Sequence, residues 1–217
     1  MLTLYSYWRS SASHRVRIAL NLKGLAYEVV PVHLLRDGGQ QFSEAYRSLN
    51  PQSRVPLLVD GEFRIAQSLA IIEYLDALQP APRLIPEAPR RRAQVQAFAL
   101  AIAADLQPLQ NTGTLNYLRD TVGVDDAGRA LWLRHFLERG LAALETEAAA
   151  RPSTPFVFGD APTLADCVLV PQMFSARRFN CDMARFPRLT QITEHCERLP
   201  AFQRAHPALQ PDAESTH

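Results

Sequence analysis

Three hydroxyl side chains and an arginine cluster near the start of the sequence, at a predicted junction of strand and helix. Ser10, Ser11 and Ser13 follow Arg9 within four residues. The unpaired N–H groups and the dipole at the start of a helix favour a bound anion. A thiol at such a position ionises more easily, because the thiolate is the anion. One serine would be enough to cap the helix, so three hydroxyls beside an arginine indicate a site for a thiolate or another anion.

The elements that would position this cluster alternate between strand and helix over the first eighty residues. Apolar spacing and turn signals predict a strand at Leu2–Tyr7, a helix from about Ser13 to Gly24, a β-rich run at 27–34, a short helix at 43–49, strands at Leu57–Val59 and Glu62–Ala66, and an amphipathic helix up to Leu78 capped by Ser68. Asp60-Gly61 is a strong hairpin signal between the last two strands. The order βαβαββα predicts a small mixed sheet with helices on its faces, a thioredoxin-like unit.

A proline-rich stretch ends this alternation. Residues 79–89 carry four prolines, which neither a helix nor a central strand tolerates, so they are interpreted as a linker. The sequence therefore predicts an α/β domain at 1–79, a linker at 80–89 and an all-helical domain at 90–217.

The remaining sequence has helical spacing throughout. We expect a long helix at 90–120 that Pro108 kinks and an amphipathic helix through Leu133, Leu137 and Leu144. Thr163 and Asp166 form a capping box that opens a buried helix at 164–174, and the polar tail after Pro207 is expected to be frayed.

Composition narrows the functional classes. The 217 residues carry a formal net charge of +1, with 47% hydrophobic and 21% charged residues, as in an ordinary soluble globular protein. This charge predicts no general attraction to nucleic acid or to acidic membranes. No apolar run reaches the roughly 18 residues of a membrane span, and the first residues already form a strand pattern, which leaves no room for a signal peptide. We therefore expect a cytoplasmic protein.

The cysteines and histidines indicate neither a disulfide framework nor a metal centre. Cys167, Cys181 and Cys196 are odd in number and form no C-x-x-C pair, and the six histidines form no H-x-x-x-H pair. Two of the cysteines lie in apolar surroundings and are expected to act as small core residues.

Two further features of the first domain fit a ligand beside the serines. Val55-Pro56 starts a strand, where proline is tolerated only at an edge or in a turn. Gln67-Ser68 stands at the start of the next helix and offers a second helix N-terminus to a carboxylate. A ligand with an extended peptide backbone, a carboxylate and a thiol would use all three features.

The motifs resemble those of zeta-class glutathione transferases. They are S-S-x-S-x-R-V-R-I-A-L at 10–20, N-P-x-x-x-V-P at 50–56 and Q-S-L-A-I-I-E-Y-L at 67–75, continued by QPLQN at 107–111, TLAD at 163–166, LVPQ at 169–172 and ARRF at 176–179. The resemblance spans nearly the whole chain.

This resemblance implies glutathione as cofactor and assigns roles to individual residues. It implies that Ser10 and Ser11 face the glutathione sulfur, that the Val55–Pro56 bond is cis and the Val55 backbone pairs with the cysteinyl backbone, and that Gln67 and Ser68 hold the γ-glutamyl carboxylate. Further glutathione contacts are implied for Gln41, Gln107 and Asn111, and binding of substrate carboxylates for Arg9 and Arg178. It also implies a homodimer.

The class includes maleylacetoacetate isomerase, so the resemblance implies a glutathione-dependent cis–trans isomerase of a small dicarboxylate. The expected reaction converts maleylacetoacetate to fumarylacetoacetate in tyrosine and phenylalanine breakdown. One departure matters, because Ala12 stands where many members of the class carry cysteine. The nucleophile must then be the sulfur of glutathione itself.

Other activities are compatible with the same residues. One is maleylpyruvate isomerisation, although the small uncharged Thr112 and Gly113 after Asn111 are more typical of maleylacetoacetate enzymes. Another is a transferase or dehalogenase acting on small α-halo acids. A noncatalytic binding module would be expected to lose the serines or the Gln-Ser pair. A thiol–disulfide oxidoreductase is disfavoured because the helix start has no cysteine.

Overall fold

The amino-terminal part of the chain forms the mixed sheet that the alternating pattern predicts. In the computed structural model, which describes residues 1–214, its strands are β1 (Leu2–Ser6), β2 (Tyr27–Pro31), β3 (Leu57–Asp60) and β4 (Phe63–Ala66). Their order is β2-β1-β3-β4, with β1 parallel to β2 and the other pairs antiparallel. Leu4 of β1 lies opposite Val29 and Leu58, so the sheet is apolar at its centre.

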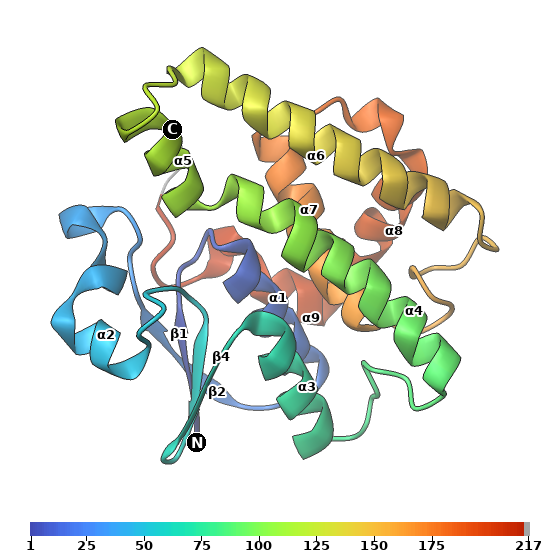
Figure 1. Ribbon diagram of the computed structural model, residues 1–217. Coiled ribbons are helices and arrows are strands. Elements are labelled where there is room, and N and C mark those ends of the chain that lie inside the picture. The colour runs from blue at the N-terminus through green and yellow to red at the C-terminus, as the bar shows by residue number, and fades with distance from the viewer. Residues whose placement is uncertain (215–217) are drawn as a thin grey trace. The chain divides into compact units, whose positions relative to one another are not determined.

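Helices cover both faces of this sheet (Figure 1). Helices α1 (Ser11–Leu22) and α3 (Ser68–Leu78) pack against each other on one face, and the short α2 (Glu44–Leu49) lies on the other. Leu4, Val16, Leu58 and Ile72 are completely buried between these layers. The apolar spacing of both long helices points their buried residues toward the sheet, which explains why the pattern was readable from the sequence.

The end of the chain belongs to this first unit and not to the helical one. The chain divides into a unit of Met1–Leu84 with the residues from Leu199 on, and a unit of Ile85–Arg198. Helix α9 (Pro200–Ala205) packs on α1. There, Asn21 Nδ2 donates to the Ala201 carbonyl at 2.9 Å, and Arg17 Nε donates to the Ala205 carbonyl at 3.1 Å. The predicted domain boundary at 90–217 therefore differs from the observed division, because two polar side chains on α1 bind the main chain of α9.

The expected long helix at 90–120 is divided. It comprises α4 (Pro89–Leu100), a π-helical turn (Ala101–Leu106), a 3-10 turn (Gln107–Gln110) and α5 (Thr112–Asp120). Pro108 lies in the first turn of the 3-10 segment, where its missing N–H costs no hydrogen bond, and Asn111 is extended. The interruption at Pro108 is thus confirmed, but it is a break and not a kink in one helix.

The rest of the second unit follows the predicted pattern. Helix α6 (Asp126–Ala149) buries Leu133, Leu137 and Leu144, and α8 (Pro187–Glu197) packs on it. Helix α7 (Leu164–Arg178) is buried along most of its length. This confirms the expected central helix.

The capping box at the start of α7 is present. Asp166 accepts hydrogen bonds from the N–H groups of Val157 at 2.9 Å and Thr163 at 2.8 Å, and from the Thr163 hydroxyl at 3.0 Å. Burial raises the pKa of Asp166 to about 6, and the hydrogen bonds that it accepts act in the opposite direction. The carboxylate therefore joins the loop before α7 to the helix.

Asp166→Ala should lower the free energy of unfolding by about 2–4 kcal/mol, because it leaves two buried N–H groups without an acceptor. Asp160→Ala, an exposed aspartate on the same loop, is the matched control and should change stability by about 0.5 kcal/mol or less. Urea unfolding followed by circular dichroism measures both. Equal stability of the two variants would contradict the structural role of the capping box.

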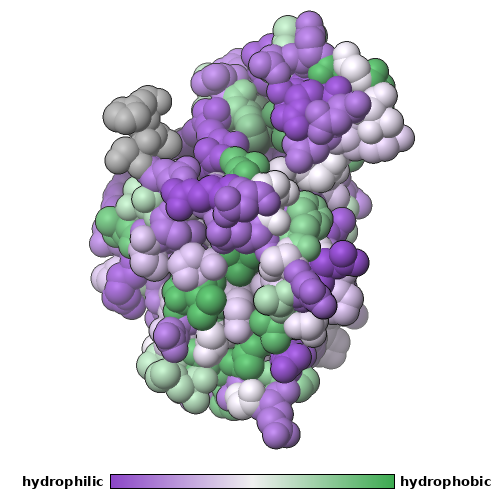
Figure 2. Space-filling view, turned by 90° about the vertical axis from the view of Figure 1, so that its left-hand side faces the viewer, coloured by the Kyte–Doolittle hydropathy of each residue, from purple (hydrophilic) through white to green (hydrophobic). Residues whose placement is uncertain are grey.

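Hydrophobic and hydrophilic residues are interspersed over the face drawn in Figure 2. Within residues 1–214, none of the helices combines the length and the hydrophobicity that crossing a membrane requires.

Candidate functional site

The serine cluster lies at the start of α1, which begins two residues earlier than predicted. The helix begins at Ser11, and the Ser10 hydroxyl caps it by accepting from the Ser13 N–H at 3.3 Å. Ser13 is completely buried, and its hydroxyl accepts from the Tyr7 N–H at 3.5 Å. Ser13 therefore holds the strand–helix turn, whereas Ser10 and Ser11 are half-buried at the helix start.

A buried arginine fixes the turn that carries these serines. Arg17 is 0% exposed and donates to the carbonyls of Tyr7 at 3.4 Å and Trp8 at 2.9 Å, and to the Ser6 hydroxyl at 3.1 Å. Burial lowers its pKa to about 10, so it remains a cation at neutral pH. The Tyr7 carbonyl also accepts from the Ser10 N–H at 3.0 Å. Arg17 therefore joins three consecutive residues of the turn, Ser6, Tyr7 and Trp8, and holds its path.

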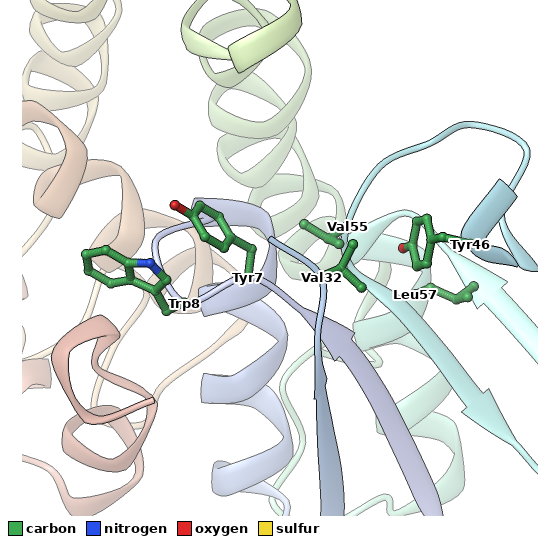
Figure 3. Packing of buried hydrophobic residues seen from close by; sticks show 6 residues of the cluster. All are labelled: Tyr7, Trp8, Val32, Tyr46, Val55 and Leu57. Carbon is green, nitrogen blue, oxygen red and sulfur yellow. The ribbon is translucent and has the colours of Figure 1, made fainter. Parts of the chain in front are cut away.

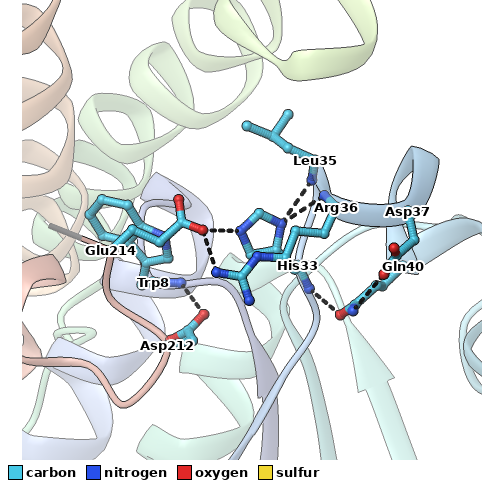
Figure 4. A network of polar contacts seen from close by, with 8 residues as sticks. All are labelled: Trp8, His33, Leu35, Arg36, Asp37, Gln40, Asp212 and Glu214. Carbon is cyan, nitrogen blue, oxygen red and sulfur yellow. Dashed lines mark hydrogen bonds and ion pairs between the residues drawn. The ribbon is translucent and has the colours of Figure 1, made fainter. Parts of the chain in front are cut away.

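The carboxyl-terminal segment holds the same turn from its other side (Figure 4). Asp212 accepts from the Trp8 N–H at 2.9 Å. His33 Nδ1 accepts from the N–H groups of Leu35 and Arg36, which assigns the ring proton to Nε2, and Nε2 lies 3.1 Å from Glu214. The tail was expected to be frayed. It is held as far as Glu214, and residues 215–217 lie outside the described part.

The N-P-x-x-x-V-P motif forms a loop that is anchored by its own Asn50 and by Tyr46 of α2. The Arg54 carbonyl accepts from the Tyr46 hydroxyl at 2.7 Å and from Asn50 Nδ2 at 2.8 Å. Val55 follows and packs in a hydrophobic cluster with Tyr7 and Leu57 (Figure 3). Its bond to Pro56 is cis, which confirms that expectation.

The main chain of Val55 is available to a ligand. The ladder between β3 and β4 begins at Leu57, and within the described residues no hydrogen bond reaches the Val55 N–H or carbonyl. Since buried main-chain groups are almost always paired, this residue fits a partner with an extended peptide backbone.

The start of α3 corrects one prediction. Gln67, and not Ser68, occupies the N-cap position, with a φ of 71° and no side-chain cap. The Gln67 side chain instead donates to Gln52 at 2.7 Å, which joins the α3 start to the 50–56 loop. Ser68 is 7% exposed, and its hydroxyl accepts from Arg15 Nη1 at 3.3 Å. The first N–H groups of α3 therefore have no acceptor from a capping side chain, as an anion site requires.

Gln41, in a 3-10 turn (Gln40–Phe42), and Arg9, in the turn before α1, lie in the same unit. Gln41 is 5% exposed; its Nε2 donates to the Leu34 carbonyl at 3.4 Å, and its Oε1 has no partner among the described residues. Gly39, with a φ of 105°, packs on this amide so closely that a Cβ there would lie 2.6 Å from Gln41 Nε2. The Arg9 guanidinium lies 5.2 Å from the centre of the Trp8 ring.

The second unit carries the remaining predicted site residues. Gln107 Nε2 donates to Asn111 Oδ1 across the break between the helices. Gln110 and Gln172 pair at 2.7 Å, so the break is lined by amides. A helix interrupted by a π turn is frequent at functional sites.

The two arginines at the end of α7 differ. Arg177 forms an ion pair with Glu197 at 2.7 Å, the behaviour expected of a solvated face. Arg178 is exposed, with its guanidinium 4.5 Å from the centre of the Phe179 ring.

The residues that support these loops were not among the predicted site residues. Arg15 and Arg17 belong to an amphipathic helix pattern, and Tyr46 belongs to a short helix and carries no local signal of a role. Asp212 and Glu214 lie about 200 residues from the loop that they bind. The one available signal was the buried side of α1, where two arginines occupy positions that the helical period assigns to the core.

Removal of the Ser10 hydroxyl should have a measurable structural cost. Ser10→Ala should lower the free energy of unfolding by about 1 kcal/mol, because the helix loses its cap. Ser11→Ala, which changes the first helical residue, should alter it by about 0.5 kcal/mol or less. Chemical denaturation of both variants measures this difference, and a larger loss for Ser11→Ala would contradict the assignment of the cap.

Comparison with known proteins identifies the family of this chain. The family model described as "Glutathione S-transferase, N-terminal domain" matches residues 1–77, and "Glutathione S-transferase, C-terminal domain" matches 126–208. A "Probable maleylacetoacetate isomerase" of Vibrio cholerae is 50% identical over 98% of both chains.

Two solved structures extend the similarity. One is the holo structure of a maleyl pyruvate isomerase, a bacterial zeta-class glutathione S-transferase, with a TM-score of 0.95 and 44% identity over 98% of this chain and 100% of that one. The other is the maleylacetoacetate isomerase of Anaeromyxobacter dehalogenans with bound dicarboxyethyl glutathione and citrate, with a TM-score of 0.86 and 45% identity over 99% and 98%. The chain belongs to the glutathione S-transferase family, and its relatives are those of the zeta class.

Proposed function

We propose that this protein is a glutathione-dependent cis–trans isomerase that converts maleylacetoacetate to fumarylacetoacetate. The observation that carries the proposal is that a single unit presents two half-buried hydroxyls at one helix start, an unpaired Val55 main chain and an uncapped second helix start. These features match the thiol, the peptide backbone and the carboxylate of glutathione.

Ser10 and Ser11 stabilise a thiolate in this proposal. The Ser10 oxygen accepts from the main chain, so its proton can be donated to an anion. Lowering a thiol pKa by about one to two units corresponds to roughly 1.4–2.7 kcal/mol of preference for the thiolate. A hydroxyl donating to a charged acceptor and a helix N-terminus together supply energies of this size.

The other glutathione groups have separate partners. Val55 pairs with the cysteinyl backbone, and Gln67 and Ser68 hold the γ-glutamyl carboxylate. Gln41, Gln107 and Asn111 provide further contacts. Gln41 supports this with its unpartnered Oε1, which accepts a ligand N–H.

The chain offers no thiol of its own for this chemistry. Ala12 occupies the position next to the serines, and all three cysteines are buried. Burial raises the pKa of Cys181 to about 11 and that of Cys196 further still, so neither is a thiolate at neutral pH. Bound glutathione supplies the sulfur that adds to the cis double bond and leaves again after rotation about the resulting single bond.

The substrate is a small dicarboxylate. Arg9 and Arg178 bind its carboxylates, since a guanidinium pairs with a carboxylate through two parallel hydrogen bonds. The Anaeromyxobacter relative supports this chemistry, because the dicarboxyethyl group of its bound glutathione derivative carries two carboxylates. We also propose a cytoplasmic homodimer acting in tyrosine breakdown, and sedimentation of the purified protein tests its dimeric state.

Turnover of maleylacetoacetate, measured with and without glutathione, tests the function. The protein dialysed free of small thiols should be inactive, and added glutathione should restore isomerisation. Ser10→Ala or Ser11→Ala should lower the rate by about 10-fold and shift its pH profile to higher pH, because the bound thiol ionises less readily. Undiminished isomerisation without any thiol, or equal rates and pH profiles for wild type and both variants, would contradict the proposal.

The same assay separates the other candidates. Maleylpyruvate as a parallel substrate measures the preference between the two isomerase activities, which the similarity to a maleylpyruvate isomerase makes necessary. An α-halo acid that yields halide and a stable glutathione adduct, with no isomerisation of either keto acid, would assign a transferase instead.

A further inference from the structure

Arg15 is a buried cation that has no counter-charge within the described part of the chain. Its side chain is 1% exposed, and Nη1 donates to the Ser68 hydroxyl at 3.3 Å. Nε and Nη2 have no hydrogen-bond partner within residues 1–214, and no carboxylate of that part forms an ion pair with them. A buried charge in this situation costs several kcal/mol on general grounds, so its presence needs an explanation.

The neighbouring Arg17 makes the contrast clear. It lies two residues further along α1 and is equally buried. Its guanidinium donates to the carbonyls of Tyr7, Trp8 and Ala205 and to the Ser6 hydroxyl, so its role in the fold accounts for its burial. Within the described residues, Arg15 makes one hydrogen bond, to the Ser68 hydroxyl, which does not explain its burial.

The single contact of Arg15 leads to a place that favours an anion. Ser68 is the first residue of α3, an 11-residue helix with no capping side chain. The dipole and the unpaired N–H groups there attract a carboxylate. The charge of the guanidinium, the proton of the Ser68 hydroxyl and the dipole of α3 therefore all attract an anion to the same point.

Ser68 transmits the effect of Arg15 because a hydroxyl has one proton. When its oxygen accepts from Arg15, that proton is left for an acceptor on the ligand. Arg15 stays shielded from solvent behind Ser68, where a charge acts through a low dielectric and is little screened by salt. It can thus strengthen carboxylate binding without touching the ligand.

We propose that Arg15 is a positioning residue that provides the buried counter-charge for the γ-glutamyl carboxylate of glutathione and orients the Ser68 hydroxyl toward it. This inference rests on the proposed use of glutathione. It extends that proposal to a residue behind the ligand contacts, and it predicts that bound glutathione compensates a charge that the protein alone leaves uncompensated.

Binding calorimetry with two tripeptides tests the proposal. The probes are glutathione and 4-aminobutanoyl-cysteinylglycine, which lacks only the α-carboxylate of the γ-glutamyl group. Arg15→Met and Arg15→Gln should each bind glutathione 10- to 100-fold more weakly than wild type, whereas the analogue should bind all three proteins within threefold. Arg15→Lys keeps the charge and should recover part of the loss.

Unfolding in urea provides the second readout, with Arg17→Met as the matched variant on the same helix. Arg15→Met should be as stable as wild type or more stable, because removal of an unpaired buried charge relieves its desolvation. Arg17→Met should be less stable, because four hydrogen bonds to the fold are lost. A loss of stability shared by all the Arg15 variants would assign Arg15 a structural role and overturn the proposal.

The binding results also separate this inference from the proposed function. If wild type binds glutathione and Arg15→Gln binds it equally well, only the role of Arg15 is overturned. The same holds if the variants lose affinity for glutathione and the analogue alike. If wild type binds no glutathione, the proposed function and the inference both fail.

Discussion

The buried guanidinium of Arg17 is the constraint on which the site depends. The turn from β1 into α1 must place hydroxyls at a helix start, and its main-chain carbonyls at Tyr7 and Trp8 point to Arg17. The N–H of Trp8 is bound by Asp212, from the other end of the chain. Because the turn is held on both sides by partners from elsewhere, Ser10 and Ser11 are not needed to bind distant parts of the fold.

One arrangement is shared by the starts of α1 and α3 in the first unit. At α1 the Ser10 oxygen accepts from a main-chain N–H, and at α3 the Ser68 oxygen accepts from Arg15. In each case the protein uses the acceptor side of a hydroxyl and leaves the proton to be donated. A hydroxyl prepared in this way favours an anionic partner over a neutral one, and the helix dipole adds to the preference. Two such points suit a ligand with two separated anionic groups, as a thiolate and a carboxylate are.

The sequence allowed the elements to be predicted better than their connections. The alternation of strands and helices, the capping box at Thr163 and the buried α7 follow from periodicity and local chemistry, and the structure confirms them. The N-cap of α3 was assigned to Ser68, because serine is the better cap by type; the backbone instead gives this position to Gln67, at positive φ. The association of α9 with α1 could not be predicted, since it depends on side chains almost 200 residues away in the chain. The role of Arg15 could not be predicted either, because it depends on the burial of its side chain and on its contact with Ser68, 53 residues further along the chain.

The uncompensated charge of Arg15 links ligand binding to stability. A protein that buries a cation without a partner is less stable than its packing alone would make it, and a ligand carboxylate beside Ser68 offsets that cost. By linkage, a ligand that binds only the folded chain raises its stability by RT ln(1 + [L]/Kd). Natural proteins retain such locally unfavourable groups mainly at functional sites. The start of α3, which has no capping side chain and lies beside the buried Arg15, is therefore a place where a ligand carboxylate adds to the stability of the fold.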